Sequence, residues 1–212
     1  RALLTVAIMS AMVMQVLDTT IVNVALPHME ASLTASQDTI SWVLTSYILA
    51  TAVAIPITGW LADRIGTRRL FLLSVAMFVG SSMLCGLAQN LTEIVLFRGL
   101  QGVGGAFLAP LAQSIMLDIN KPSEQARAMS VYGMGIMVGP IMGPIIGGWL
   151  TESFDWRWCF YVNVPVGLFC LTGLMLLMPE KPLRRREGVR VGFALLAIGL
   201  TCLQLMIDRG QN

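Results

Sequence analysis

Charged residues are scarce in this chain. Only 12% of its 212 residues are Asp, Glu, Lys or Arg, whereas 56% are hydrophobic. A soluble globular domain carries about 25% charged residues, so these are too few to cover a water-exposed surface. Intrinsic disorder requires low hydrophobicity and high net charge, and a net charge of +2 offers no basic face for nucleic acid. The composition therefore indicates a membrane protein in contact with the lipid bilayer.

Cysteine and histidine are also scarce, and their spacing lacks the usual metal and redox motifs. The four cysteines lie in or beside apolar runs without a CxxC pair, and the single histidine, His28, has no ligand near it in sequence. Zinc or redox chemistry would require clustered ligands at short spacing. We therefore expect no metal site and no disulfide framework.

Seven apolar runs are long enough to cross a bilayer, for which a helix needs about 20 mostly apolar residues. They cover residues 3–26, 39–61, 70–88, 92–117, 127–150, 160–178 and 190–207. The first run has little basic leading region and no small-residue cleavage site, so it is a spanning helix rather than a signal peptide. The expected fold class is all-α and polytopic.

The positions of Lys and Arg predict the orientation. Eleven of the 14 precede the first run or lie in the loops after the second, fourth and sixth runs, whereas the opposite side holds Arg157 and Arg209. Cytoplasmic loops carry the excess of positive charge. We therefore expect the N-terminus in the cytoplasm.

Asp18 and Arg98 are the two charged residues that fall well inside a span. Ionisable residues at such positions are costly and indicate function. Counted from the outer ends of their helices, they lie roughly 12 and 9 Å deep, so they could meet in one layer. Because burial and nearby positive charge decide whether a carboxyl group holds a proton, the pair is a candidate for proton coupling. A static ion pair that fixes helix packing is the alternative.

Polar side chains extend from Asp18 along the first span. Gln15, Thr19 and Asn23 recur there at helical spacing. We expect this stripe, with Gln101 on the fourth span, to line a substrate cavity.

Glycines recur every four residues along the fifth span. They are Gly135, Gly139, Gly143 and Gly147, with Gly148 next to the last, and Pro140 and Pro144 each follow a glycine. Small residues at this spacing let helix backbones approach closely, whereas proline removes a backbone hydrogen bond and favours a bend. The pattern predicts a tight seam or a hinge. A second glycine cluster, at residues 99–105, predicts close helix contact beside Arg98 and not a phosphate loop, because no strand precedes it.

The loop between the second and third spans is short and ordered in its sequence, G-W-L-A-D-R-I-G-T-R-R. It contains Gly59, Asp63, Arg64, Gly66, Arg68 and Arg69. Asp63 is expected either to cap a helix start or to pair with a basic neighbour.

Six segments together resemble a known family. They are L-D-T-T-I-V-N-V-A-L-P at 17–27, the loop at 59–69, R-G-L-Q-G-V-G-G at 98–105, G-P-I-M-G-P-I-I-G-G at 139–148, W-R-W-C-F-Y-V-N-V-P-V-G at 156–167 and L-M-I-D-R-G at 205–210. The chain resembles the N-terminal half of a major facilitator superfamily transporter. It is most similar to the 14-helix drug:proton antiporters, the group that includes the EmrB and QacA type exporters.

The resemblance implies a domain organisation. Residues 1–178 would form the N-terminal six-helix bundle, 179–190 a basic cytoplasmic linker and 190–207 an additional transmembrane helix. Such transporters pair two bundles around a site near the midplane of the membrane, so a C-terminal bundle is expected beyond these residues.

The resemblance also implies a function and roles for residues. The chain would belong to a proton-coupled multidrug efflux transporter of the bacterial inner membrane, with Asp18 and Arg98 in proton coupling and the proton gradient in place of a cofactor. Its substrates would be hydrophobic or amphipathic compounds, and a periplasmic adaptor and an outer-membrane channel are possible partners. The loop charges of the family contact the fourth helix, which implies that Asp118 pairs with Arg68 or Arg69. Here Thr67 stands where the family usually has a basic residue.

Other functions are weighed against this one. A narrow-substrate exporter or a proton-coupled importer has the same fold, and only the resemblance of the fifth span to an export motif argues against the importer. Seven spans also suggest a receptor or photosensor, but that would need an extracellular N-terminus or a lysine in the last span. No nucleophile and base are grouped in the sequence, so we do not expect an enzyme.

Overall fold

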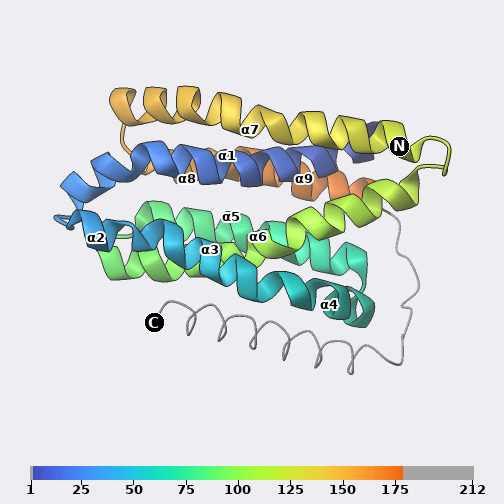
Figure 1. Cartoon of the computed structure of the whole chain (residues 1–212), viewed down its shortest axis with the longest axis horizontal. Helices are drawn as coiled ribbons and strands as arrows, with labels where there is room; N and C mark the ends of the chain where they lie inside the picture. The colour runs from blue at the N-terminus through green and yellow to red at the C-terminus, as the bar shows by residue number, and fades with distance from the viewer. Residues whose placement is uncertain (1, 179–212) are drawn as a thin grey trace, which may run out of the picture.

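A computed structural model describes residues 2–178 (Figure 1). Six helical stretches in this part are long and apolar enough to cross a membrane. Four are single helices, namely α1 (Ala2–Ser32), α5 (Thr67–Leu87), α6 (Leu91–Ile119) and α7 (Gln125–Ser153). The second stretch joins α2 (Gln37–Ile40), α3 (Trp42–Ala54), the 3₁₀ helix η1 (Ile55–Ile57) and α4 (Thr58–Ile65), and the last joins α8 (Trp158–Tyr161) and α9 (Asn163–Leu177).

The all-α prediction is confirmed, since residues 2–178 contain helices and no strand. The first six predicted spans correspond to the six stretches. The linker at 179–190 and the helix predicted at 190–207 lie outside the described residues, and the domain division stays a prediction.

The second span changes its helix type at a proline. Pro56 lies in the first turn of η1, which separates α3 from α4. Proline has no N–H to donate and restricts the residue before it, so a 3₁₀ turn is a local way to continue the chain.

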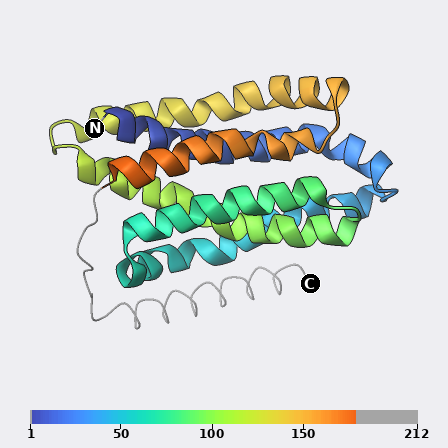
Figure 2. The ribbon, with the colours of Figure 1, turned by 180° about the vertical axis from the view of Figure 1, so that it is seen from behind.

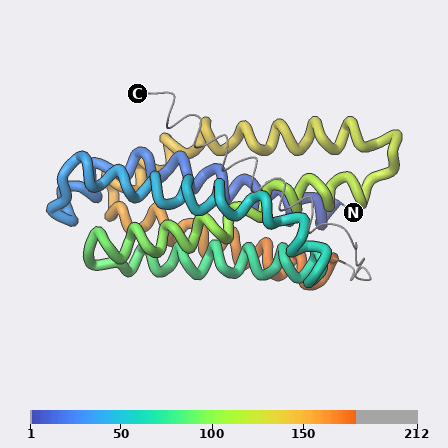
Figure 3. Tube along the Cα trace, turned by 60° about the horizontal axis from the view of Figure 1, so that its bottom comes forward, coloured from blue at the N-terminus to red at the C-terminus, as the bar shows by residue number. Residues whose placement is uncertain are grey.

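The helices pack as two groups of three. In one group α1 lies between α7 and α9, and in the other α6 lies between α3 and α5, while α5 also contacts α9. Figures 1 and 2 show the two groups from opposite sides. The trace in Figure 3 shows the long helices running along one direction, with loops at both ends. The arrangement brings α1 and α6, which carry the two charges, to the middle of the bundle.

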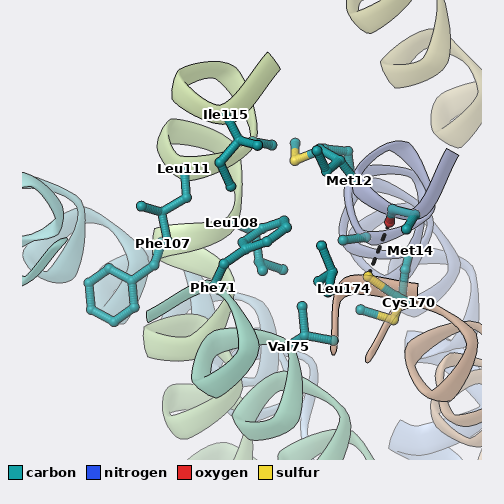
Figure 4. Packing of buried hydrophobic residues seen from close by; sticks show 14 of the residues in the cluster. Met12, Met14, Phe71, Val75, Phe107, Leu108, Leu111, Ile115, Cys170 and Leu174 are labelled. Atoms are coloured by element: carbon teal, nitrogen blue, oxygen red, sulfur yellow. Dashed lines mark hydrogen bonds between the residues drawn. The ribbon is translucent and has the colours of Figure 1, made fainter. Parts of the chain in front are cut away.

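Two apolar clusters fill the bundle. The first cluster includes Met12, Phe71, Val75, Leu108 and Leu174 (Figure 4). The second cluster includes Ile21, Val43, Cys85, Ile94 and Phe160. Five buried polar residues between the two clusters are joined to one another by side-chain hydrogen bonds, and they are Asp18, Ser82, Arg98, Gln101 and Asn163. We call these five the polar layer. Burial of polar groups requires hydrogen-bonding partners, so the layer is where side chains must be matched to one another.

The outer faces of the bundle are apolar. On α7 the exposed side chains include Met134, Met137, Ile141, Ile145 and Trp149. Large exposed apolar surface marks contact with a membrane or with further protein. This surface is therefore consistent with helices that cross a bilayer.

Candidate functional site

Asp18 and Arg98 form an ion pair at the centre of the polar layer. The Arg98 Nη1 donates to Asp18 Oδ2 over 2.6 Å, and the two side chains are 0–1% exposed. The contact predicted from their matching depths is thus present. Its role in proton coupling stays a prediction. Two charges withdrawn from water in this way are costly unless they are paired and hydrogen-bonded.

The other oxygen of Asp18 accepts two amide N–H groups. Gln101 Nε2 donates to Asp18 Oδ1 over 3.0 Å, and Asn163 Nδ2 donates to the same atom over 2.7 Å. The carboxylate therefore accepts three N–H donors, from α6 and α9. Hydrogen bonds are stronger when the acceptor is ionised. Three N–H donors around one carboxyl group therefore favour an ionised Asp18.

Arg98 has further partners besides Asp18. Its Nη1 donates to Gln101 Oε1 over 2.7 Å, and its Nε donates to the carbonyl of Val43 over 3.4 Å. The Tyr47 ring lies 4.3 Å from its guanidinium carbon and the Phe160 ring 5.8 Å. A desolvated cation gains from aromatic faces at these distances. Arg98 is thus held by α1, α3, α6 and α8 together.

Asn163 and Ser82 are members of the layer that the sequence analysis did not predict. Asn163 Nδ2 also donates to Ser82 Oγ over 3.0 Å, and the Ser82 hydroxyl donates to the carbonyl of Phe160 over 2.8 Å. Asn163 lies in the segment 156–167 that carries part of the family resemblance. The sequence signal for Asn163 was a polar amide side chain inside a mostly apolar span. Ser82 offered none, because serines in apolar helices commonly donate to their own backbone.

The residues predicted to line a cavity lie on α1 and α6, and that role stays a prediction. Gln15, Thr19 and Asn23 lie on α1 with partly or largely exposed side chains. Gln15 Nε2 donates to the carbonyl of Gly105 on α6 over 2.9 Å, and Asn23 Nδ2 donates to the carbonyl of Thr19. Gln101 is fully buried and belongs to the polar layer. Its predicted role in lining a cavity stays a prediction, and in this structure its amide hydrogen-bonds to both members of the ion pair.

A groove of about 550 Å³ runs along a different face of α1. It is lined by side chains of α1 and α7 and by Val166 of α9, and these include Val6, Met9, Val13, Met134 and Val138. None of the four residues of the predicted cavity lines it.

The glycines of α7 form a seam with α1. A Cβ at Gly139 would overlap Val16, and a Cβ at Gly143 would overlap Thr20. The Thr20 hydroxyl also donates across the seam to the carbonyl of Gly139 over 3.2 Å. Only a residue without a side chain permits this approach of two backbones. The structure therefore shows a seam where the sequence predicted a seam or a hinge.

The ends of the glycine motif behave differently. A Cβ at Gly135 would meet Met9 and one at Gly147 would lie 3.3 Å from the Cα of Ile21, whereas Gly148 faces open space. The helix continues through Pro140 and Pro144, both of which are exposed. Gly148 is therefore outside the seam, and the prolines do not break α7.

Glycines on α6 bring two neighbours close to Arg98. A Cβ at Gly102 would lie 2.5 Å from the carbonyl oxygen of Tyr47, and one at Gly104 would lie 2.9 Å from the backbone nitrogen of Phe78. Gly99 faces open space. The predicted close contact is present on two sides of α6, with α3 and with α5.

The loop motif joins α4 to α5 through one glycine. Gly66 has φ 93° and ψ 139°, a region that side chains rarely adopt. Asp63 lies inside α4, so the alternative in which it caps a helix start is wrong. Arg64 lies over the ring of Trp60 at 5.2 Å, and Arg68 Nη2 donates to the carbonyl of Met175 at the end of α9 over 2.7 Å.

The structure locates the remaining residues of the loop motif, but it does not test their predicted roles. Gly59 lies on α4, Arg69 on α5 and Asp118 on α6. The pairing of Asp118 with Arg68 or Arg69 stays a prediction.

Gly66→Ala is expected to destabilise the protein by about 1–3 kcal/mol, because alanine must adopt the strained φ of the turn. Gly59→Ala is the matched control, since it faces open space inside α4, where alanine is a better helix former than glycine. Thermal unfolding of the purified full-length protein measures both changes. Equal unfolding temperatures for the two variants would contradict the role given to Gly66.

Comparisons with known proteins place this geometry in a family. The family model described as Major Facilitator Superfamily matches residues 8–206. The multidrug export protein EmrB of Haemophilus influenzae is 44% identical over 99% of the chain, and EmrB of Escherichia coli K12 is 41% identical over 99%. The fatty acid resistance protein FarB of Neisseria gonorrhoeae is 40% identical over the whole chain. The chain spans 41–42% of the length of these three relatives.

Solved structures share the fold at low identity. A proton:xylose symporter, XylE, superposes with a TM-score of 0.76 at 15% identity, covering 84% of this chain and 44% of the other. A peptide transporter, POT, superposes with a TM-score of 0.75 at 16% identity, covering 96% of this chain and 45% of the other. These similarities bear on the fold alone.

Proposed function

The chain belongs to the Major Facilitator Superfamily, and on that premise we propose that it forms part of a proton-coupled multidrug exporter. The family consists of transporters and not of enzymes, and the chain is a multi-pass membrane protein. The relatives named as multidrug export proteins support export of small molecules. The observation that carries the coupling is the Asp18–Arg98 ion pair, fully buried between two apolar clusters.

The proposed cycle exchanges a proton for a substrate at Asp18. The carboxyl group loses its proton toward the cytoplasm as a hydrophobic or amphipathic compound binds, and it takes up another when the site faces outward. An ionised Asp18 has Arg98 as its counter-charge, whereas a protonated one leaves Arg98 uncompensated in an apolar surrounding. Protonation of Asp18 therefore changes the free energy of this conformation by more than about one kcal/mol. Such a change is enough to shift the equilibrium between two conformations several-fold.

The seam between α1 and α7 supports a mechanical role for the same helix. Asp18 lies two residues before Thr20 on α1, and the Thr20 hydroxyl crosses to α7. A change in the charge state of Asp18 would therefore act on a helix that is in direct backbone contact with α7. We propose that the two helices move as one unit during alternating access.

We propose a location and partners from the family resemblance and from the positions of Lys and Arg. The protein would lie in the bacterial inner membrane with its N-terminus in the cytoplasm. A periplasmic adaptor and an outer-membrane channel are proposed partners of the full-length protein. The proton gradient supplies the energy, and no cofactor is needed for this cycle.

The proposal is tested by efflux of a fluorescent cationic dye from proteoliposomes that contain the full-length protein. Efflux is expected to require an imposed proton gradient and to stop when a protonophore collapses it. A panel of dyes separates a multidrug exporter from a narrow-substrate one. Gradient-driven dye accumulation in the opposite direction would identify an importer, and transport that is indifferent to the gradient would contradict proton coupling.

Arg98→Lys is expected to shift the pH profile of efflux by about one pH unit toward higher pH. Lysine keeps the charge but loses the Nε donor to the carbonyl of Val43 and the flat face against Tyr47. The ionised carboxyl group is then stabilised less well. Arg127→Lys on the exposed face of α7 is the control. An unchanged profile in Arg98→Lys would favour a static ion pair.

A further inference from the structure

Asn163 and Ser82 connect Asp18 to the junction between α8 and α9. Their side chains are buried, with residue exposures of 2% and 0%. The Asn163 amide nitrogen bridges Asp18 Oδ1 at 2.7 Å and Ser82 Oγ at 3.0 Å. The Ser82 hydroxyl then donates to the Phe160 carbonyl, which also accepts the N–H of Val162 where α8 ends. A chain of hydrogen bonds therefore runs from the carboxylate to the backbone of another helix.

The direction of each hydrogen bond follows from the ionised state of Asp18. An ionised carboxylate accepts and cannot donate, so Asn163 must present its nitrogen. The same nitrogen also donates to Ser82 Oγ, so the Ser82 hydroxyl must donate its own proton to another acceptor. That acceptor is the Phe160 carbonyl. These donors and acceptors are mutually consistent for an ionised Asp18.

A proton on Asp18 changes what its neighbours must supply. The protonated carboxyl group carries an O–H that needs an acceptor, because an unsatisfied buried donor is costly. The Gln101 oxygen already accepts from Arg98 over 2.7 Å. Asn163 can supply an acceptor by rotation of its amide about the last side-chain bond, which exchanges nitrogen for oxygen without movement of the backbone.

The other titratable and charged groups around Asp18 do not offer this acceptor. Arg98 on α6 has only donors. Among the described residues, Tyr47 on α3, Cys85 on α5 and Cys159 on α8 make no hydrogen bond to Asp18, and the Cys85 thiol is directed at Gln101 Oε1 at 3.8 Å. From α7, this part of α1 meets glycines of the seam.

We propose that Asn163 and Ser82 are positioning residues that respond to the protonation state of Asp18. This inference rests on the proposed function, because it assumes that Asp18 exchanges a proton during transport. When Asp18 is ionised, Asn163 donates to it and Ser82 donates to Phe160. When Asp18 is protonated, its O–H donates to Asn163 Oδ1, and the Ser82 hydroxyl rotates to donate to the same oxygen. The only covalent change is the proton gained by Asp18, and the hydrogen bond from Ser82 to Phe160 is released.

The consequence is a local signal at the α8–α9 junction. Loss of the Ser82 hydrogen bond removes one donor from the Phe160 carbonyl, which shares the N–H of Val162 with the carbonyl of Trp158. The Phe160 ring lies 5.8 Å from the Arg98 guanidinium carbon. The residue whose carbonyl loses the Ser82 hydrogen bond is therefore also in contact with Arg98. Protonation of Asp18 would thus loosen the start of α9.

The inference is tested by pH-difference infrared spectroscopy on the full-length protein, with dye binding measured over the same pH range. The C=O band of a protonated carboxyl group is assigned to Asp18 by its loss in Asp18→Asn. In Asn163→Ala we expect this band at higher frequency, because its O–H has lost its acceptor. We also expect the midpoint of dye binding to move up by about one pH unit, because the carboxylate has lost a donor.

Neighbouring serines provide a matched pair of variants. Ser82→Ala is expected to shift the same band, whereas Ser81→Ala is expected to leave it unchanged, since the buried Ser81 donates to Met77 within its own helix. Ser82→Ala keeps the amide, so it tests the inference even without a folded Asn163→Ala protein. An equal effect of both serine variants, or an unchanged band in Asn163→Ala, would overturn the inference. Absence of any band that depends on Asp18 would instead overturn the proposed function.

Discussion

Asp18→Asn is expected to abolish gradient-driven efflux and reduce it to the leak of liposomes without protein. Asparagine has nearly the same shape as aspartate but cannot take up or release a proton. The change therefore removes the proposed exchange while it leaves a polar side chain in the polar layer. Dye efflux from proteoliposomes with an imposed proton gradient measures it, and Asp38→Asn at the exposed start of α2 is the control.

The effect of Asp18→Asn on folding must be separated from its effect on coupling. Without its partner, Arg98 becomes an uncompensated buried charge, and breaking a buried ion pair costs about 3–5 kcal/mol. The double variant Asp18→Asn/Arg98→Gln removes both charges and is expected to unfold at a higher temperature than Asp18→Asn while efflux stays absent. Gradient-driven efflux at the wild-type rate in either variant would remove Asp18 from the mechanism.

Gly143→Leu is expected to cause the second large loss, in both stability and efflux. Even a Cβ at this position would overlap the Thr20 side chain, so leucine must separate α7 from α1. Overpacking of a close contact costs about 1–3 kcal/mol or more. Thermal unfolding and dye efflux of the purified full-length protein measure the two effects.

Gly148→Leu is the control for the seam. It lies on the same helix, but its Cβ would face open space, so its unfolding temperature and efflux should stay close to those of the wild type. If Gly143→Leu matched Gly148→Leu in both measurements, the seam would not have the role that we assign to it.

The spans and the ion pair were predictable because each depends on a local signal. Apolar runs follow from the length that a bilayer requires. The meeting of Asp18 with Arg98 followed from the depth of each residue in its own helix, without knowledge of which helices are neighbours. Their isolation in apolar sequence made them conspicuous.

The rest of the polar layer was not predictable, because its residues are identified only by their neighbours. Ser81 and Ser82 are adjacent and both buried, yet one donates within its own helix and the other to Phe160 on α8. Gln101 was expected to line a cavity, and its contact with Asp18 came from the packing of α6 against α1, which the sequence does not specify. These contacts depend on how each helix is rotated about its own axis. Because the spans are apolar on all sides, the sequence pattern does not show which face of a helix points inward.

The central claim is that Asp18 exchanges a proton against substrate, and proton release on substrate binding tests it most directly. The measurement adds a cationic dye to the purified full-length protein in a weakly buffered solution that contains a pH indicator. The wild type is expected to release protons as the dye binds, and Asp18→Asn is expected to bind dye without releasing any. Equal proton release from the two proteins would contradict the account.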